Sequence, residues 1–202
     1  MAGNPGPSPR VGVLALQGDF REHLRVLTAL GADARSVRRP EELSEIDGLV
    51  IPGGESSVMD KLSRAFGLAG PLREAVAGGL PVYGTCAGLI MLADRVLDGI
   101  EGQQSIGGLD VSVRRNAFGN QLESFETDLA IPRLGEPGIH AVFIRAPVVV
   151  EAGPDVDVLA SLDDGRIVAV ESRNVLGTAF HPEVTGDSRI HSYFLQKVAN
   201  AH

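Results

Sequence analysis

The amino-acid sequence predicts an α/β protein, a three-layer sandwich in which helices cover both faces of a mixed, mostly parallel sheet. In the first half, short apolar runs typical of buried strands alternate with amphipathic helical stretches, the pattern of parallel strands joined by crossover helices. In the second half, strand-like runs follow one another with turn residues between them. Hydrophobic residues make up 44% of the 202 residues and charged residues 22%, which is typical of a globular protein.

Continuous apolar runs ending at turn residues mark the strands of the first half, as expected for strands buried on both faces. After the first strand, Phe20, Leu24 and Leu27 share one face of a predicted helix, and Gly31 supplies its C-terminal glycine. The predicted strands are Val11–Leu16, Asp33–Val37, Gly48–Ile51 and Leu80–Tyr83.

Three further helices are predicted between and after these strands. Ser57 and Asp60 have the spacing of a capping box and predict a helix start. Pro71 suits the first turn of the next helix, which we expect to end at Gly78. A short apolar helix through Met91 follows the fourth strand directly.

The second half is richer in strands and ends in a helix. Ile190, Phe194 and Val198 lie at i, i+4 and i+8 and predict its apolar face, whereas His23 and His191 are interpreted as helix-surface residues. Residues 1–10 read as a flexible tail and residues 11–202 as a single domain. The predicted strands are Leu109–Val113, Ile139–Ile144, Val148–Glu151, Val158–Leu162, Ile167–Val170 and Val175–Phe180.

Composition excludes several classes of function. A net charge of −8 and a pI near 5.1 leave no global basic surface for nucleic acid. The apolar runs are far shorter than the ~18 residues of a membrane span, so we expect no membrane association. A single cysteine excludes an internal disulfide and a cysteine-cluster metal site, and fits the reducing cytoplasm. We expect no metal and no cofactor.

Cys86 is the first candidate catalytic residue. It lies in Gly84-Thr85-Cys86-Ala87-Gly88, between a predicted strand and a predicted helix, which is the spacing of a nucleophile elbow with cysteine in place of serine. A helix N-terminus also favours the reactive thiolate. The alternative is a buried cysteine that acts as a small hydrophobe.

His181 and Glu183 form the second candidate. They follow the last predicted strand, and residues two apart in an extended chain point to the same side, so Glu183 can orient the imidazole. Pro182 keeps His181 extended. A general base oriented by a third group is the logic of a catalytic triad. The tripeptide by itself also fits a surface histidine beside a solvated glutamate.

Two further groups could bind a ligand. Gly53 and Gly54 follow a strand at the edge where open α/β sheets bind ligands, and glycines allow backbone N–H groups to turn toward an anion, although the two glycines also fit an ordinary turn. Arg145 interrupts an apolar stretch, where its charge is costly unless paired; with Arg115 it could bind a ligand carboxylate or form a structural salt bridge.

These motifs fall in one order along the chain and together resemble a known family. The segments are Leu14-Ala15-Leu16-Gln17-Gly18, Pro52-Gly53-Gly54-Glu55-Ser56, Gly84-Thr85-Cys86-Ala87-Gly88, Arg115-Asn116-x-Phe118-Gly119, Ser124-Phe125-Glu126, Phe143-Ile144-Arg145-Ala146-Pro147 and His181-Pro182-Glu183. They resemble the glutaminase subunits of pyridoxal 5′-phosphate (vitamin B6) synthase, a family of class I, triad-type glutamine amidotransferases. Val58 and Asn120 depart from the family's usual pattern.

The resemblance implies a flavodoxin-like fold, L-glutamine as substrate and a Cys86–His181–Glu183 triad. The enzyme would hydrolyse glutamine to glutamate and ammonia through a cysteine thioester and pass the ammonia to a separate synthase subunit. Backbone N–H groups near Gly54 and of Ala87 would form the oxyanion hole. By matching position, the resemblance assigns glutamine binding to Gly53, Gly54, Glu55, Arg115, Ile144 and Arg145.

Two alternatives remain open at the level of sequence. The chain could be a glutaminase serving another synthase or a related cysteine hydrolase. It could also be a non-catalytic regulatory module, because fold does not fix function. The presence of Cys86, His181 and Glu183 together argues against the regulatory module.

Overall fold

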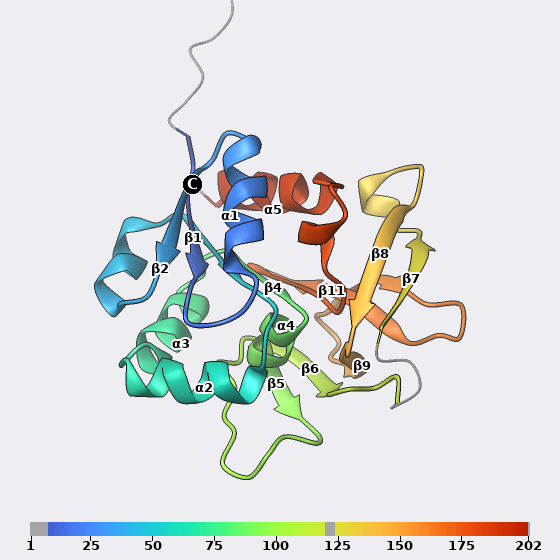
Figure 1. Ribbon diagram of the computed structural model, residues 1–202, viewed down its shortest axis with the longest axis horizontal. Helices are drawn as coiled ribbons and strands as arrows, with labels where there is room; N and C mark the ends of the chain where they lie inside the picture. The colour runs from blue at the N-terminus through green and yellow to red at the C-terminus, as the bar shows by residue number, and fades with distance from the viewer. Residues whose placement is uncertain (1–7, 120–123, 202) are drawn as a thin grey trace, which may run out of the picture.

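The computed structural model describes residues 8–119 and 124–201 (Figure 1). Most of the predicted N-terminal tail, residues 1–7, and Asn120 lie outside the described residues. Arg10, which we had assigned to the tail, begins the first strand instead.

A mixed sheet forms the centre of the fold, as predicted, and it contains ten strands. Its first five strands in spatial order run parallel: β2 (Asp33–Val37), β1 (Arg10–Leu14), β3 (Gly48–Ile51), β4 (Val82–Thr85) and β12 (Val175–Thr178). The sheet continues through β11 (Ile167–Ser172), β9 (Val148–Ala152), β6 (Leu109–Arg114) and β5 (Ala93–Val96), with β10 (Asp157–Ser161) paired to β11. A separate hairpin consists of β7 (Ser124–Leu129) and β8 (Ile139–Ile144).

Helices lie on both faces of the parallel part of the sheet, which gives the predicted three layers (Figure 1). One face carries α1 (Phe20–Ala29) and α5 (Arg189–Ala199); the other carries α2 (Ser56–Ala65), α3 (Ala69–Ala77) and α4 (Ala87–Leu92). The 3₁₀ turns are η1 (Pro40–Glu45), η2 (Pro132–Leu134) and η3 (Pro182–Val184). Among the described residues, no helix is long and apolar enough to cross a membrane.

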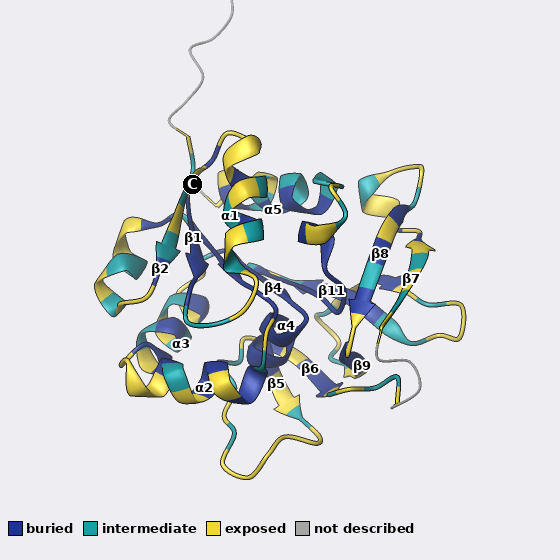
Figure 2. Ribbon diagram, viewed as in Figure 1, coloured by how far each residue is buried: buried dark blue, intermediate teal, exposed yellow. Residues whose placement is uncertain are grey.

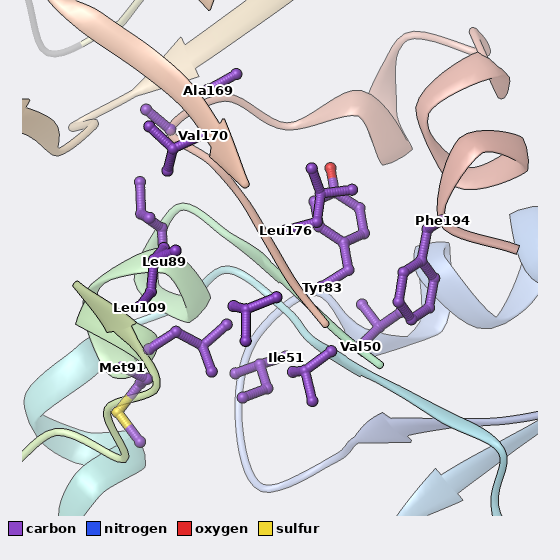
Figure 3. Packing of buried hydrophobic residues seen from close by; sticks show 14 of the residues in the cluster. Val50, Ile51, Tyr83, Leu89, Met91, Leu109, Ala169, Val170, Leu176 and Phe194 are labelled. Atoms are coloured by element: carbon purple, nitrogen blue, oxygen red, sulfur yellow. The ribbon is translucent and has the colours of Figure 1, made fainter. Parts of the chain in front are cut away.

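The core lies between the layers, and the central strands β3, β4 and β12 are buried along their whole length (Figure 2). Toward α5, the ring of Tyr83 packs 5.8 Å from the ring of Phe194 (Figure 3). On the opposite face, Leu89 of α4 packs against Gly177 of β12. A Cβ atom on Gly177 would lie 2.6 Å from the Leu89 side chain. This burial on both faces explains why these strands read as continuous apolar runs.

Several boundaries differ from prediction. Strand β4 begins two residues later than expected and reaches Thr85, and β12 ends at Thr178 rather than Phe180. Strands β5 and β7 were not predicted. Helix α2 is capped by Glu55, whose carboxylate accepts the Ser57 N–H at 3.2 Å, so the predicted capping box at Ser57 is wrong.

The interpretation of His23 and His191 as helix-surface residues is also wrong. Both side chains are completely buried, one on α1 and the other on α5. Each faces the sheet, and their rings contact one another, His23 Nδ1 lying 2.9 Å from His191 Nε2. Mutual hydrogen bonding explains how two polar rings are accommodated there.

Candidate active site

The turn between β4 and α4 has the geometry of a nucleophile elbow. Cys86 has φ 50°, a left-handed conformation that a non-glycine residue rarely adopts, and its N–H is held by the Thr178 carbonyl at 2.8 Å. Glycines allow α4 to start this close to the sheet. A Cβ atom on Gly84 would lie 2.5 Å from the carbonyl carbon of Gly88, and one on Gly88 would lie 2.0 Å from the Ile51 oxygen. The elbow therefore presents Cys86 at the N-terminus of α4.

His181 is placed beside Cys86 by strand pairing. Strands β4 and β12 run parallel, with Thr85 opposite Thr178, so the chain leaves both strands at the same edge of the sheet. The His181 N–H is bonded to Val142 of β8 at 2.9 Å. The side chains of His181 and Cys86 are hydrogen bonded to each other.

Glu183 lies behind His181, and its Oε1 is 2.7 Å from His181 Nδ1. Both side chains are buried. The contact does not arise from an extended chain, as predicted, because residues 182–184 form the 3₁₀ turn η3, which folds the carboxylate back toward the ring. Sulfur, imidazole and carboxylate thus lie in series.

The electrostatics of the series favour a protonated imidazole. Burial would lower the pKa of His181, but hydrogen bonds to Cys86 and Glu183, and the charges of those groups, outweigh it and raise the pKa to about 10. His181 therefore holds its proton at neutral pH. An imidazolium beside a thiol favours the thiolate, the nucleophilic form.

A cleft of about 290 Å³ opens in front of Cys86 and His181. It lies at the carboxyl ends of the parallel strands, whereas a hollow of about 360 Å³ near Lys197 contains none of the predicted site residues. The predicted residues that line the cleft are Gly54, Glu55, Cys86, Ala87, Arg115, Ile144, Arg145 and His181.

The turn at Gly53 and Gly54 closes one side of the cleft. A Cβ atom on Gly53 would lie 2.5 Å from His181 Cε1, so this residue packs directly on the imidazole. Gly54 has φ 151°, and a Cβ atom there would lie 2.4 Å from the Gln17 side-chain oxygen. Both positions therefore leave no room for a side chain.

Arg115 and Glu55 form an ion pair at the cleft wall, 3.0 Å apart. The guanidinium is mostly buried and also donates to Gln103 at 3.1 Å. The structural salt bridge considered for the arginines therefore exists at Arg115. Its effect is to hold the Glu55 carboxylate at the edge of the cleft.

Arg145 differs from expectation. It follows the end of β8 with φ 44° and is exposed, so its charge costs little there and the argument from a buried, unpaired cation is wrong. Within the described part of the chain its guanidinium makes no ion pair, so it remains available to a ligand. Neighbouring Ile144 is half-exposed, and its carbonyl lies 3.9 Å from the Cys86 sulfur.

Sequence reasoning gave no role to two other cleft residues, Gln17 and Asp19. The Gln17 side-chain oxygen accepts the Glu55 N–H at 2.9 Å, and Asp19 Oδ2 lies 3.9 Å from His181 Nδ1. Their position directly after β1, at the same edge as the elbow, is the signal that could have identified them. Asp19, His181 and Glu183 could offer ligand atoms to a metal, but the last two already bind each other.

The fold and this site define a class of protein: α/β hydrolytic enzymes in which an elbow cysteine is paired with a histidine and a carboxylate. The chain belongs to the SNO glutamine amidotransferase family, whose model matches residues 13–200.

Individual relatives agree with this assignment. The chain is 73% identical to a protein named pyridoxal 5′-phosphate synthase subunit PdxT of Leifsonia xyli subsp. xyli, over 95% of this chain and 96% of the relative. It is 61% identical to the protein of the same name from Parafrankia sp., over 95% and 94% of the two chains. A crystal structure described as glutamine amidotransferase superposes with a TM-score of 0.87 at 47% identity, covering 94% of this chain and 98% of the other.

Proposed function

We propose that this protein is the glutaminase subunit of a pyridoxal 5′-phosphate synthase, which hydrolyses L-glutamine to L-glutamate and ammonia for a separate synthase subunit. The hydrogen-bonded series Cys86–His181–Glu183, at the mouth of a cleft with an unpaired arginine on its rim, carries the proposal. The names of the relatives, subunits of pyridoxal 5′-phosphate synthase, support the choice of pathway.

In the first half of the reaction, the Cys86 thiolate attacks the carboxamide carbon of glutamine. The developing oxyanion is bound by backbone N–H groups near Gly54 and of Ala87, and loss of one such donor typically costs about 3 kcal/mol. His181, protonated at neutral pH, gives its proton to the departing nitrogen. The C–N bond breaks, ammonia leaves and a γ-glutamyl thioester remains on Cys86.

In the second half, His181 takes a proton from water, which attacks the thioester carbon. The C–S bond breaks, glutamate leaves, and the thiolate–imidazolium pair is restored. Glu183 keeps the ring oriented through Nδ1 and stabilises its positive charge in both halves.

The cleft wall supplies groups of both charges for the amino-acid head of glutamine. The guanidinium of Arg145 suits the α-carboxylate, since a planar guanidinium binds a carboxylate through two parallel hydrogen bonds. The Glu55 carboxylate, held by Arg115, suits the α-ammonium group. Ile144 shapes the cleft around the side chain of glutamine, and Gly53 packs on the imidazole of His181.

The ammonia must reach a second active site directly, because free ammonia in water is largely protonated and no longer nucleophilic. The cleft described above accounts for glutamine hydrolysis alone, so a synthase subunit is the proposed acceptor. The cytoplasm is the proposed location, since a lone nucleophilic cysteine requires a reducing compartment.

Glutamine hydrolysis by the chain, with and without the cognate synthase subunit, tests the proposal. Wild-type complex should release glutamate and form pyridoxal 5′-phosphate from glutamine, a pentose phosphate and a triose phosphate. Cys86→Ala should abolish synthesis from glutamine and spare synthesis from added ammonia. Glutamine use that survives Cys86→Ala would exclude the cysteine mechanism, and glutaminase activity without pyridoxal 5′-phosphate formation would indicate a different synthase.

A further inference from the structure

Behind the proposed triad lies a second pair of imidazoles that the mechanism above does not use. His23 of α1 and His191 of α5 are both completely buried, and neither lines the cleft. His23 Nδ1 lies 2.9 Å from His191 Nε2, so one hydrogen atom is shared between the two rings. On its other side, His23 Nε2 points back toward the triad.

His23 Nε2 is hydrogen bonded to Thr85 Oγ1 and also lies close to the second carboxylate oxygen of Glu183, Oε2. Glu183 Oε1 binds His181, whereas Oε2 is buried without a hydrogen bond of standard geometry among the described residues. His23 Nε2 lies 3.5 Å from this Oε2 and 3.2 Å from Thr85 Oγ1, between the two oxygens. A shared N–H from His23 would therefore satisfy an otherwise unpaired buried carboxylate oxygen.

The surroundings decide which nitrogen of His23 carries the hydrogen. Burial, followed by the charges of His191 and His181, lowers the pKa of His23 well below its usual value, and burial lowers the pKa of His191 to about 4, so both rings are neutral at neutral pH. If His23 donated through Nδ1, its Nε2 could accept the Thr85 hydroxyl, but it would have no hydrogen to offer Glu183 Oε2, and this buried oxygen would stay unpaired within the described part of the chain. His191 would then hold its hydrogen on Nδ1, which is buried without a partner among the described residues.

The reverse arrangement removes both penalties. If His191 Nε2–H donates to His23 Nδ1, the hydrogen of His23 sits on Nε2 and faces Glu183 and Thr85. The buried Nδ1 of His191 then carries a lone pair instead of an orphaned N–H, which is costly to bury without an acceptor. The order of donors is thus His191 to His23, and His23 to Glu183.

We infer that His23, held as its Nε2–H tautomer by His191, is a positioning residue that donates to Glu183 Oε2 and keeps this carboxylate aligned on His181. The inference rests on the proposed glutaminase function. His23 on α1 and His191 on α5 would then orient the general base through Glu183, although neither side chain lines the substrate cleft. Outer hydrogen bonds of this kind orient metal-bound histidines in the same way.

Two amide substitutions separate the roles of the two nitrogens of His23. The amide nitrogen of a glutamine can occupy the place of Nε2, whereas that of an asparagine reaches only the place of Nδ1. His23→Asn should therefore lower kcat for glutamine by about tenfold to a hundredfold, the effect of losing a hydrogen bond to a charged group. His23→Gln should retain most of kcat. KM should stay unchanged in both variants, because His23 lies outside the cleft.

Thr85→Val tests the other acceptor of His23 Nε2. It removes the Thr85 hydroxyl and leaves Glu183 as the acceptor, so its kcat should fall less than that of His23→Asn. His140→Leu is the matched control, since His140 is a surface residue paired with Glu126 and Asp128 on the β7–β8 hairpin, and its kcat should equal that of wild type. Thermal unfolding of each variant establishes that it folds.

Nuclear magnetic resonance of ¹⁵N-histidine-labelled full-length chain tests the tautomer without any assay of activity. Protonated and unprotonated ring nitrogens have separate ¹⁵N shifts, and the signals that disappear in His23→Gln are those of His23 among the five histidines. A protonated Nε2 and bare Nδ1 on His23 would support the inference. A protonated Nδ1 on His23, or equal kcat in the Asn and Gln variants, would overturn it. A wild-type complex with the synthase subunit that hydrolyses no glutamine would refute the proposed function instead, and the tautomer would still be measured.

Discussion

Acid should weaken the folded state through the buried histidine pair, and replacing His191 should remove part of that effect. The pKa of His191 is lowered by burial from 6.5 to about 4. As pH falls through 6.5, the unfolded chain binds a proton at this residue and the folded chain does not. The contribution of neutral His191 to stability is therefore present above pH 6.5 and is lost as pH falls toward 4.

The size of the effect follows from the two pKa values. Between pH 7 and pH 5, a residue with pKa 6.5 unfolded and about 4 folded removes about 2 kcal/mol from the free energy of unfolding. His191→Leu has no such titration, so its free energy of unfolding should fall by about 2 kcal/mol less over this interval. His23, whose pKa is also lowered, continues to titrate and leaves a residual acid slope in the variant.

Urea unfolding of wild-type and variant chains at pH 7, 6 and 5 measures this difference. The comparison is between the slopes of the free energy of unfolding against pH. Loss of the His191–His23 hydrogen bond lowers this free energy equally at each pH, so it does not change the slope. His140→Leu is the control, because His140 is exposed, its pKa is raised by hydrogen bonds to Glu126 and Asp128, and its removal should not flatten the acid slope. Equal slopes for wild type and His191→Leu would show that His191 titrates alike in the folded and unfolded chains, which would refute the lowered pKa of the buried ring.

Three further predictions concern the site. Gly88→Ala should lower the free energy of unfolding by at least about 2 kcal/mol in urea titrations, since its Cβ would lie 2.0 Å from the Ile51 carbonyl oxygen. Gly70 lies in open space on α3, so Gly70→Ala is the control and should change the free energy of unfolding by less than about 1 kcal/mol. Arg145→Ala should raise KM for glutamine by about tenfold or more in steady-state assays, and an unchanged KM would remove Arg145 from substrate binding. Glu183→Gln should lower kcat by at least about a hundredfold at nearly constant KM, because it removes the charge that stabilises the imidazolium.

Local sequence was sufficient to predict the elbow, the strand before it and the helix after it. The chain segment from Gly84 to Gly88 specifies a tight turn by itself, because only small residues allow α4 to approach the sheet. The Arg115–Glu55 ion pair joins residues 60 positions apart, and no local pattern predicts such a contact. Arg145 was misjudged because an apolar run was taken as evidence of burial, although the strand β8 ends one residue before it.

The buried histidines show that helical spacing can indicate burial even for a polar residue. His23 lies three residues after Phe20 and four before Leu27, on the predicted apolar face of α1, and its spacing therefore indicated burial. Our assignment of His23 to the helix surface did not take this spacing into account. The ring that satisfies the hydrogen bonding of buried His23 belongs to His191, which is 168 positions away in the sequence. Only the folded chain brings the two rings together.

The two helical layers position different parts of the site at the edge of the sheet. Because side chains alternate along β4, Gly84 faces α4 and admits its close approach, while Thr85 faces α1 and contacts His23. The pairing of β4 with β12 then sets Cys86 beside His181. The position of the Cys86 sulfur therefore depends on the packing of α4, whereas the orientation of Glu183 depends on the layer that contains α1 and α5. Changes in the packing of α1 against α5 should therefore alter His181, the proposed general base, and leave Cys86, the proposed nucleophile, in place.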